Sequence, residues 1–341
     1  MNPQEDPSFA VDPRRAMRLA ELLRSVRYAP DEMRHISPFA DDAFRDVHFI
    51  FFMTAIDHNT HTPTTRFETQ IGEQCVHGSD LMYAMAIAAL RSDPDLFTPS
   101  RTRDLSAAHL ARMLTTPDGQ VPVGIDERAE LLRDAANRLI ADYAGDLRRL
   151  FEAAGHRIEG PDGSGIAARL AAVRAYEDPV GKKTFLLIKL LRRRRRLHVA
   201  DPESIRVPID HVVFTIALRS GLVTASPAMV RDIRDGVCLC ERAVLALRET
   251  CRDAYVAVAR YAQQSADEFD DLLWAYGREC LREAAPFPES KITTIRIPLD
   301  DRLGNPVARE AFLRFIMGIE TGGRADLASM PVPVIPPTWY I

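Results

Sequence analysis

Apolar residues recur at helical spacing through most of the chain. Between residues 14 and 28, apolar residues lie at helical spacing: Met17, Leu19, Leu22, Leu23 and Val26. The same pattern predicts helices at about 78–91, 106–114, 126–154 with one break at Gly145, 166–176, 181–197, 211–222, 226–234, 237–262 and 267–284. The predicted fold class is therefore mainly α.

A different pattern marks residues 47–56, where almost every residue is apolar. Such a run predicts an element buried on all sides. It leads into the polar sequence DHNTHTP at residues 57–63, in which turn-forming residues replace helix formers. We expect a buried element that ends in a polar loop.

The glycine-rich sequence EGPDGSG at residues 159–165 predicts a flexible connector. It would separate an N-terminal helical lobe, residues 1–158, from a second lobe, residues 166–285. A C-terminal extension, residues 286–341, is expected to be largely irregular, with a minor β element at Lys291–Pro298 where apolar and polar residues alternate. No alternating strand and helix units and no glycine-rich phosphate loop occur, which argues against a doubly wound nucleotide-binding sheet.

Composition and charge argue against several classes of protein. The 341 residues carry 44 basic and 48 acidic side chains, a net charge of −4, so any nucleic-acid contact must be local. Five scattered cysteines form neither a disulfide framework nor a common zinc motif, which favours a reducing cytoplasm. No window approaches the roughly 18 apolar residues of a membrane span. We expect a cytoplasmic monomer without a cofactor, a bound metal or a membrane partner.

The sequence DPVGKKT at residues 178–184 predicts a tight turn that opens a helix. Gly181 at the start of this helix would bring backbone N–H groups close to a phosphate, and the positive end of the helix dipole would reinforce the attraction. Lys182 and Thr184 are candidate contacts to the same strand of nucleic acid. Five arginines, Arg192–Arg196, follow at the other end of the helix, and they cannot all face one partner because successive helical residues are about 100° apart. We expect Arg192, Arg194 and Arg195 to contact phosphates; the alternative is a solvated helix end whose positive charge complements the dipole.

Two further sequences complete the pattern: VPIDHVVFTIALRSGLV at residues 207–223 and DDLLWAYGR at residues 270–278. DPVGKKT resembles the hairpin of the helix-hairpin-helix DNA glycosylase superfamily, and Lys183 falls on the lysine of that hairpin. The second sequence resembles the segment that carries the catalytic aspartate, which falls on Asp210. The third resembles a C-terminal helix of the archaeal 8-oxoguanine DNA glycosylases. The resemblance covers residues 166–285 and implies a two-lobed helix-hairpin-helix fold; it departs from the family at Pro179, which replaces the first hairpin glycine, and in a longer connection from Lys183 to Asp210.

The chain also resembles the queuosine-5′-phosphate N-glycosylases, or queuosine salvage proteins, which share a related fold. The similarity lies in an apolar segment near the start and in a Glu-Arg-x-x-x-Leu helix beginning at Glu127 and Arg128. It is longer than the first resemblance but less specific. It implies a free modified nucleotide as the substrate.

Cleavage of an N-glycosidic bond builds positive charge on the sugar, and a nearby carboxylate stabilises that charge or activates a water molecule. Asp210 is the candidate carboxylate; taken alone, an aspartate before a helix is usually only an N-cap. Lys183 lies in the first turn of its helix, where the dipole and Lys182 disfavour the ammonium and favour a neutral, nucleophilic amine. As a nucleophile it would form a Schiff base and give an associated AP-lyase activity, whereas as a phosphate ligand it would leave a monofunctional enzyme.

Other polar residues are candidates for the substrate pocket. Asp57, His58 and Asn59 either hydrogen-bond a base edge or cap a helix. The spacing of His58 and His61 does not by itself make a metal site. His211, next to Asp210, and Trp274 complete the pocket prediction, with core packing as the alternative for the indole.

The leading interpretation is an N-glycosylase that flips a modified base out of DNA and excises it, with or without AP-lyase activity, in base-excision repair or in antiviral defence against modified phage DNA. The first alternative is a nucleotide N-glycosylase of the queuosine-5′-phosphate type. A non-catalytic DNA-binding module is the third interpretation. The sequence does not determine which base is released.

Overall fold

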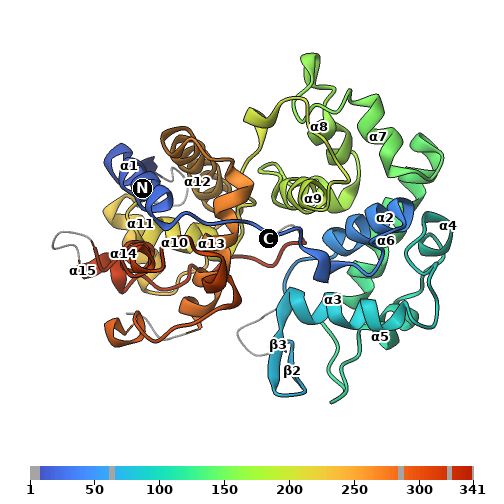
Figure 1. The fold of residues 1–341 in the computed structure, drawn as a ribbon, viewed down its shortest axis with the longest axis horizontal. Coiled ribbons are helices and arrows are strands. Elements are labelled where there is room, and N and C mark those ends of the chain that lie inside the picture. Colours follow the sequence, from blue (N-terminus) through green and yellow to red (C-terminus); the bar gives the residue numbers. More distant parts are fainter. Residues whose placement is uncertain (1–7, 61–65, 283–287, 321–324, 340–341) are drawn as a thin grey trace. The chain divides into compact units, whose positions relative to one another are not determined.

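The fold is that of a computed structural model, which describes residues 8–60, 66–282, 288–320 and 325–339. Contacts between residues divide the chain into two compact units (Figure 1). Unit 1 comprises Met1–Pro30 and Ile205–Pro336, and unit 2 comprises Asp31–Ser204 and Pro337–Ile341. The described residues are mainly helical, which confirms the predicted fold class.

Unit 2 contains most of the helices predicted for the N-terminal half. Its elements are α2 (Ala43–Ala55), β2 (Glu68–Ile71), β3 (Gln74–His77), α3 (Gly78–Ala89), α4 (Pro99–Thr102), α5 (Ala107–Leu114), α6 (Ile125–Tyr143), α7 (Leu147–Ala153), α8 (Ile166–Ala171) and α9 (Lys182–Arg193), with short 3-10 turns at Arg34–Ile36, Pro161–Gly163, Arg174–Tyr176 and Pro202–Ser204. Strands β2 and β3 form an antiparallel hairpin that pairs Glu68 with His77. The predicted break at Gly145 is confirmed, because Ala144 and Gly145 both take positive φ values between α6 and α7.

Helix α2 is the central element of unit 2. All of its residues from Asp46 to Ala55 are buried, as the apolar run predicted, and it contacts both α6 and α9. Phe51 stacks on Tyr176 with ring centroids 5.1 Å apart, and the Tyr176 hydroxyl donates to the Phe51 carbonyl at 2.6 Å. These contacts fix the carboxyl end of α2, where the polar loop at residues 57–60 begins.

Unit 1 combines the first helix with the C-terminal half of the chain. Its elements are β1 (Phe9–Val11), α1 (Pro13–Val26), α10 (His211–Arg219), β4 (Val223–Ala225), α11 (Pro227–Arg234), α12 (Glu241–Ala262), α13 (Ala266–Leu281), α14 (Val307–Ile316) and α15 (Ala325–Ala328), with 3-10 turns at Glu289–Lys291 and Pro298–Arg302. Strands β1 and β4 pair antiparallel, and α1 lies beside α12 (Figure 1). Helix α10 packs against α13, where the absence of a side chain at Gly277 lets the two helices approach closely: a Cβ there would lie 2.3 Å from Ile216 Cδ1.

The C-terminal extension differs from its prediction in two places. Lys291–Pro298 forms turns instead of a β element, because the Ile295 N–H donates locally to the Lys291 carbonyl at 2.9 Å and not to a neighbouring strand. Helix α14 lies within the extension that was expected to be largely irregular. Its apolar face packs on α1, so this helix depends on a partner from the other end of the chain.

The glycine-rich sequence at residues 159–165 is a packed turn inside unit 2, not a connector between units. The Asp201 carboxylate accepts the backbone N–H groups of Ile158 at 2.7 Å and Glu159 at 3.0 Å. A Cβ on Gly165 would lie 2.3 Å from the Ile158 carbonyl oxygen. The glycines are therefore needed for close backbone approach, which composition alone does not distinguish from flexibility.

We expect Gly165→Ala to destabilise unit 2 by about 1–3 kcal/mol, because the added methyl group meets backbone atoms that cannot move independently. Urea unfolding of the variant and the wild type measures this difference. Ser164→Ala, on the exposed side of the same turn, is the matched control and should change stability by less than about 0.5 kcal/mol. Equal stability of the Gly165→Ala variant and the control would contradict this account of the turn.

Candidate active site

The polar loop after α2 is held by three basic side chains from other helices of unit 2. Lys183 Nζ donates to the Ala55 carbonyl at 2.5 Å and Lys182 Nζ donates to the Asp57 carbonyl at 2.7 Å, both from the first turn of α9. Arg128 of α6 donates to the carbonyls of Ile56 and His58. The last carbonyls of a helix lack partners within the helix and carry partial negative charge. Since α2 has no basic residue in its own last turn, these side chains supply the missing donors.

Lys183 is fully buried, and its amine also lies 3.1 Å from His58 Nδ1. Burial lowers the pKa of this amine well below its ordinary value, and the positive charges of Lys182 and Arg128 lower it further. The neutral amine expected from the sequence is thus favoured. The main cause is burial, which the sequence did not reveal.

The side chains of Asp57, His58 and Asn59 all contact other residues of unit 2. The His58 side chain is buried, and burial together with Lys183, Arg128 and Lys182 lowers its pKa well below the ordinary value. Asp57 accepts a hydrogen bond from the Ser79 hydroxyl at 2.5 Å, and Asn59 Nδ2 donates to the Thr338 carbonyl at 2.6 Å.

These three residues therefore stabilise the loop in the structure, while contact with a base edge stays a prediction. His61 lies outside the described residues. Among the residues that are described, no group of three or more His, Cys, Asp or Glu side chains is arranged to hold a metal ion.

The first turn of α9 already has an anionic partner. The Asp178 carboxylate accepts the backbone N–H groups of Lys182 at 2.7 Å and Val180 at 3.1 Å. Gly181 precedes the helix with φ 74°, the left-handed conformation that glycine tolerates best. Lys182 and Thr184 are buried. The Asp178 carboxylate thus already accepts backbone N–H groups at the helix start, where a phosphate was expected, and binding of a nucleic-acid strand by these residues stays a prediction.

The arginine cluster divides between the core and the surface. Arg194 and Arg196 both pair with the fully buried Asp46, at 2.9 and 2.6 Å, and the Arg194 side chain is only 4% exposed. Arg195 is exposed and pairs with Glu32 at 2.8 Å. Arg192 is half-buried. Arg194, one of the three proposed phosphate contacts, is thus a core ion-pair residue, because α9 directs it toward α2.

Asp210 lies in unit 1 at the start of α10. One carboxylate oxygen accepts the Val213 N–H at 2.9 Å, which makes Asp210 the N-cap that the simpler interpretation predicted. The other oxygen accepts the indole N–H of Trp274 at 3.1 Å. Trp274 is half-buried under the Arg278 guanidinium, which lies 4.3 Å from the ring centroid. His211 is exposed at the first position of the helix.

The pairing of Asp210 with Trp274 was not predicted, although the sequence holds a signal for it. Gly277 follows Trp274 by one helical turn, and a glycine at that spacing marks the face on which α13 approaches α10. The hydrogen bonds from the Val213 N–H and the Trp274 indole together fix the orientation of the Asp210 carboxylate. Such a group, held by two donors, is prepared to stabilise a positive charge that develops next to it.

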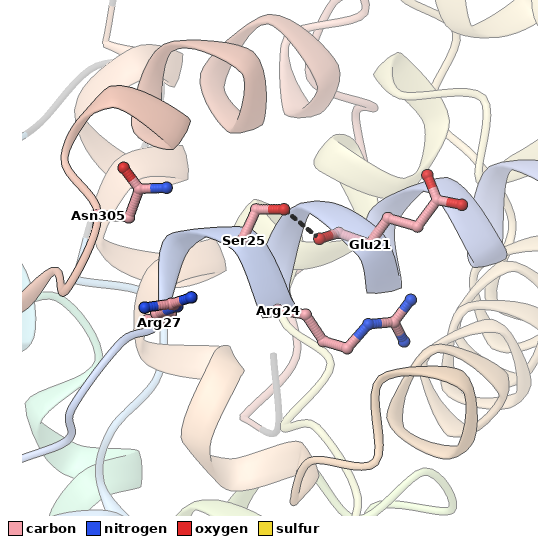
Figure 2. A pocket seen from close by; sticks show the side chains of 5 residues that line it. All are labelled: Glu21, Arg24, Ser25, Arg27 and Asn305. Atoms are coloured by element: carbon pink, nitrogen blue, oxygen red, sulfur yellow. Dashed lines mark hydrogen bonds between the residues drawn. The ribbon is translucent and has the colours of Figure 1, made fainter.

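A separate depression of about 390 Å³ lies on unit 1 (Figure 2). It is lined by Glu21, Arg24 and Ser25 of α1, by Arg27, which follows α1, and by Asn305. The Ser25 hydroxyl donates to the Glu21 carbonyl at 2.8 Å, and Arg24 donates to the Tyr261 carbonyl. This depression contains none of the side chains that the sequence motifs singled out.

Comparison with known proteins gives one family match. The family model described as queuosine salvage protein matches residues 36–160. This span includes the polar loop after α2 together with Glu127 and Arg128 of α6. It ends before the three sequences that resemble DNA glycosylases, so it supports the queuosine-salvage resemblance and adds no support for the DNA glycosylase resemblance.

No curated protein matches the chain. Within the described ranges, every helix is too short or too polar to cross a bilayer.

Proposed function

We propose that this protein is an N-glycosidase that releases the base from a free modified nucleotide of the queuosine-5′-phosphate type. The family match carries the proposal, because its span contains the loop and the arginine that surround the Lys183 amine. The net charge of −4 also suits a small substrate better than a long polyanion.

In the proposed reaction, the glycosidic bond breaks with positive charge developing on the ribose. Asp210 stabilises this charge or accepts a proton from the attacking water molecule, and its cap and indole contacts hold the carboxylate in one orientation. Lys183 contributes a neutral amine.

The direct test is incubation of the purified protein with queuosine 5′-phosphate, with its dephosphorylated nucleoside, and with a panel of duplexes that carry modified bases. Mass spectrometry then identifies any released base. We expect release from the nucleotide and none from the duplexes, with the rate falling only slightly as salt rises, since one phosphate binds few counterions. Release of a base from a duplex, with no base released from the nucleotide, would contradict the proposal.

Base excision from DNA is the second candidate, and the order of the three sequences at residues 178–184, 207–223 and 270–278 favours it. This candidate predicts a steep loss of binding with salt. It also predicts that borohydride traps a covalent adduct if Lys183 is the nucleophile, and that Lys183→Gln abolishes both trapping and strand nicking. Tight duplex binding without any released base would instead indicate the non-catalytic DNA-binding module.

A further inference from the structure

The buried amine of Lys183 has two hydrogen-bond partners within unit 2. They are the Ala55 carbonyl at 2.5 Å and His58 Nδ1 at 3.1 Å. A neutral amine has two N–H bonds and one lone pair, so it can donate one hydrogen to the Ala55 carbonyl and the other to His58 Nδ1. The lone pair is then directed away from Ala55 and His58.

The contact between Lys183 and His58 depends on the tautomer of His58. An Nδ1 that accepts a hydrogen bond from Lys183 requires the imidazole proton on Nε2, whereas an Nδ1–H would donate to the lone pair of the amine. Nε2 is buried and makes no hydrogen bond to the described part of the chain, but it faces Glu127 Oε2 at 3.5 Å. The Glu127 side chain is 38% exposed, so it links the buried pair to solvent. Catalytic contacts of this kind often shorten only when the reactants bind.

Burial favours the neutral form of this pair, and the charged groups around it act in both directions. The Lys183 amine is influenced by two cations, Lys182 and Arg128, and by two carboxylates, Asp57 and Asp178. His58 is influenced by the same two cations and by Lys183, and Glu127 lies beside its Nε2. Burial is the largest influence on both groups, and it lowers the pKa of the amine and of the imidazole. Protonation of His58 would also place an N–H on Nδ1, facing the hydrogens of the amine.

We propose that Glu127 and His58 are positioning residues for Lys183: the carboxylate holds the imidazole as the Nε2–H tautomer, and the imidazole directs the lone pair of the amine. A carboxylate, an imidazole and a nucleophile in series occur in several kinds of hydrolase, where the carboxylate selects the tautomer. Here the third member is an amine. The arrangement rests on the geometry of unit 2, and its catalytic consequence rests on the proposed function.

The tautomer is measured by nuclear magnetic resonance of the protein labelled with ¹⁵N-histidine, since protonated and unprotonated ring nitrogens have well separated shifts. The His58 signals are those lost in His58→Phe. His48 provides an internal reference of the opposite kind, because its Nδ1 lies 2.7 Å from the Phe44 carbonyl and its Nε2 accepts the Leu147 N–H at 3.1 Å. We expect His48 to carry its proton on Nδ1 and His58 on Nε2.

Glu127→Gln tests the role of the carboxylate. A glutamine amide can donate to Nε2, so we expect the His58 proton to move to Nδ1, at least in part. Glu130→Gln, on the same helix in an exposed pair with Arg174, is the matched control and should leave the His58 signals unchanged. In the nucleotide assay we expect Glu127→Gln to lower kcat by about tenfold or more with KM changed less than about threefold, because the tautomer, not substrate binding, is altered.

The outcomes separate this inference from the proposed function. A wild-type His58 that carries its proton on Nδ1, or on both nitrogens at neutral pH, overturns the inference whether or not the protein cleaves a nucleotide. The inference is also overturned if Glu127→Gln leaves the His58 tautomer unchanged. It is overturned as well if the Glu127→Gln variant of an active enzyme cleaves the nucleotide with an unaltered kcat. If no nucleotide is cleaved, the proposed function fails, and the His58 tautomer in the two glutamine variants still decides whether Glu127 and His58 position the amine.

Discussion

Asp210→Asn is expected to lower the rate of base release by about 10²–10⁴-fold, because an uncharged amide neither stabilises the developing cation nor accepts a proton. The fold should survive, since asparagine is as good an N-cap as aspartate and keeps an acceptor for the Val213 N–H. The measurement is the single-turnover rate of base release from queuosine 5′-phosphate, with substrate affinity determined by calorimetry. We expect the affinity to change by only a few-fold.

Asp12→Asn is the matched control for this loss. Asp12 is also an N-cap aspartate of unit 1 and accepts the backbone N–H groups of Arg14 at 2.9 Å and Arg15 at 3.2 Å. A change in helix capping alone would affect both variants alike, whereas loss of a catalytic carboxylate affects only Asp210→Asn. Full base release by the Asp210→Asn protein would remove Asp210 from the mechanism.

Asp46→Asn is expected to produce the largest loss of stability, about 3–5 kcal/mol for unit 2. The fully buried Asp46 carboxylate balances Arg194 and Arg196, and removal of one member of a buried pair leaves an uncompensated buried charge. The chain has two tryptophans, Trp274 in unit 1 and Trp339 in unit 2. In a Trp274→Phe background, the fluorescence of Trp339 during urea unfolding therefore reports on unit 2.

Asp95→Asn provides the control for the ion pair. Asp95 accepts a charged hydrogen bond from Arg45 at 2.6 Å, but its side chain is 55% exposed. Exposed pairs contribute about 0–1 kcal/mol because water and salt screen them. If the two variants lose equal stability, the ion pairs of Asp46 with Arg194 and Arg196 stabilise unit 2 no more than an exposed ion pair does.

The pH dependence of the reaction should report the state of Lys183. Its pKa is lowered, so the amine loses its proton at a pH well below that of an exposed lysine, and activity that requires the neutral amine rises as pH increases through this lowered value. The chain has only four lysines, which makes the titration of Lys183 separable by ¹³C resonance of labelled lysine. Lys182, whose Nζ donates to the Asp57 carbonyl, serves as the comparison within the same helix turn.

The sequence by itself determined the features that depend on neighbours along the chain. Helical spacing located α6, α9 and α10, and the residue type at position 210 indicated an N-cap, because hydrogen bonds within a helix and at its ends join residues a few positions apart. The run of apolar residues at 47–56 indicated the buried element that is α2. The polar loop after α2 followed from the change from apolar to turn-forming residues.

Only the tertiary structure decided what these elements contact. Lys183 reaches Ala55 and His58 across more than 120 positions of sequence, and Trp274 reaches Asp210 across 64. No local pattern encodes such pairs, because they arise when apolar faces pack and bring distant polar groups together. The packing also buries Lys183 and so lowers the pKa of its amine, a property that belongs to the folded surroundings and not to the residue.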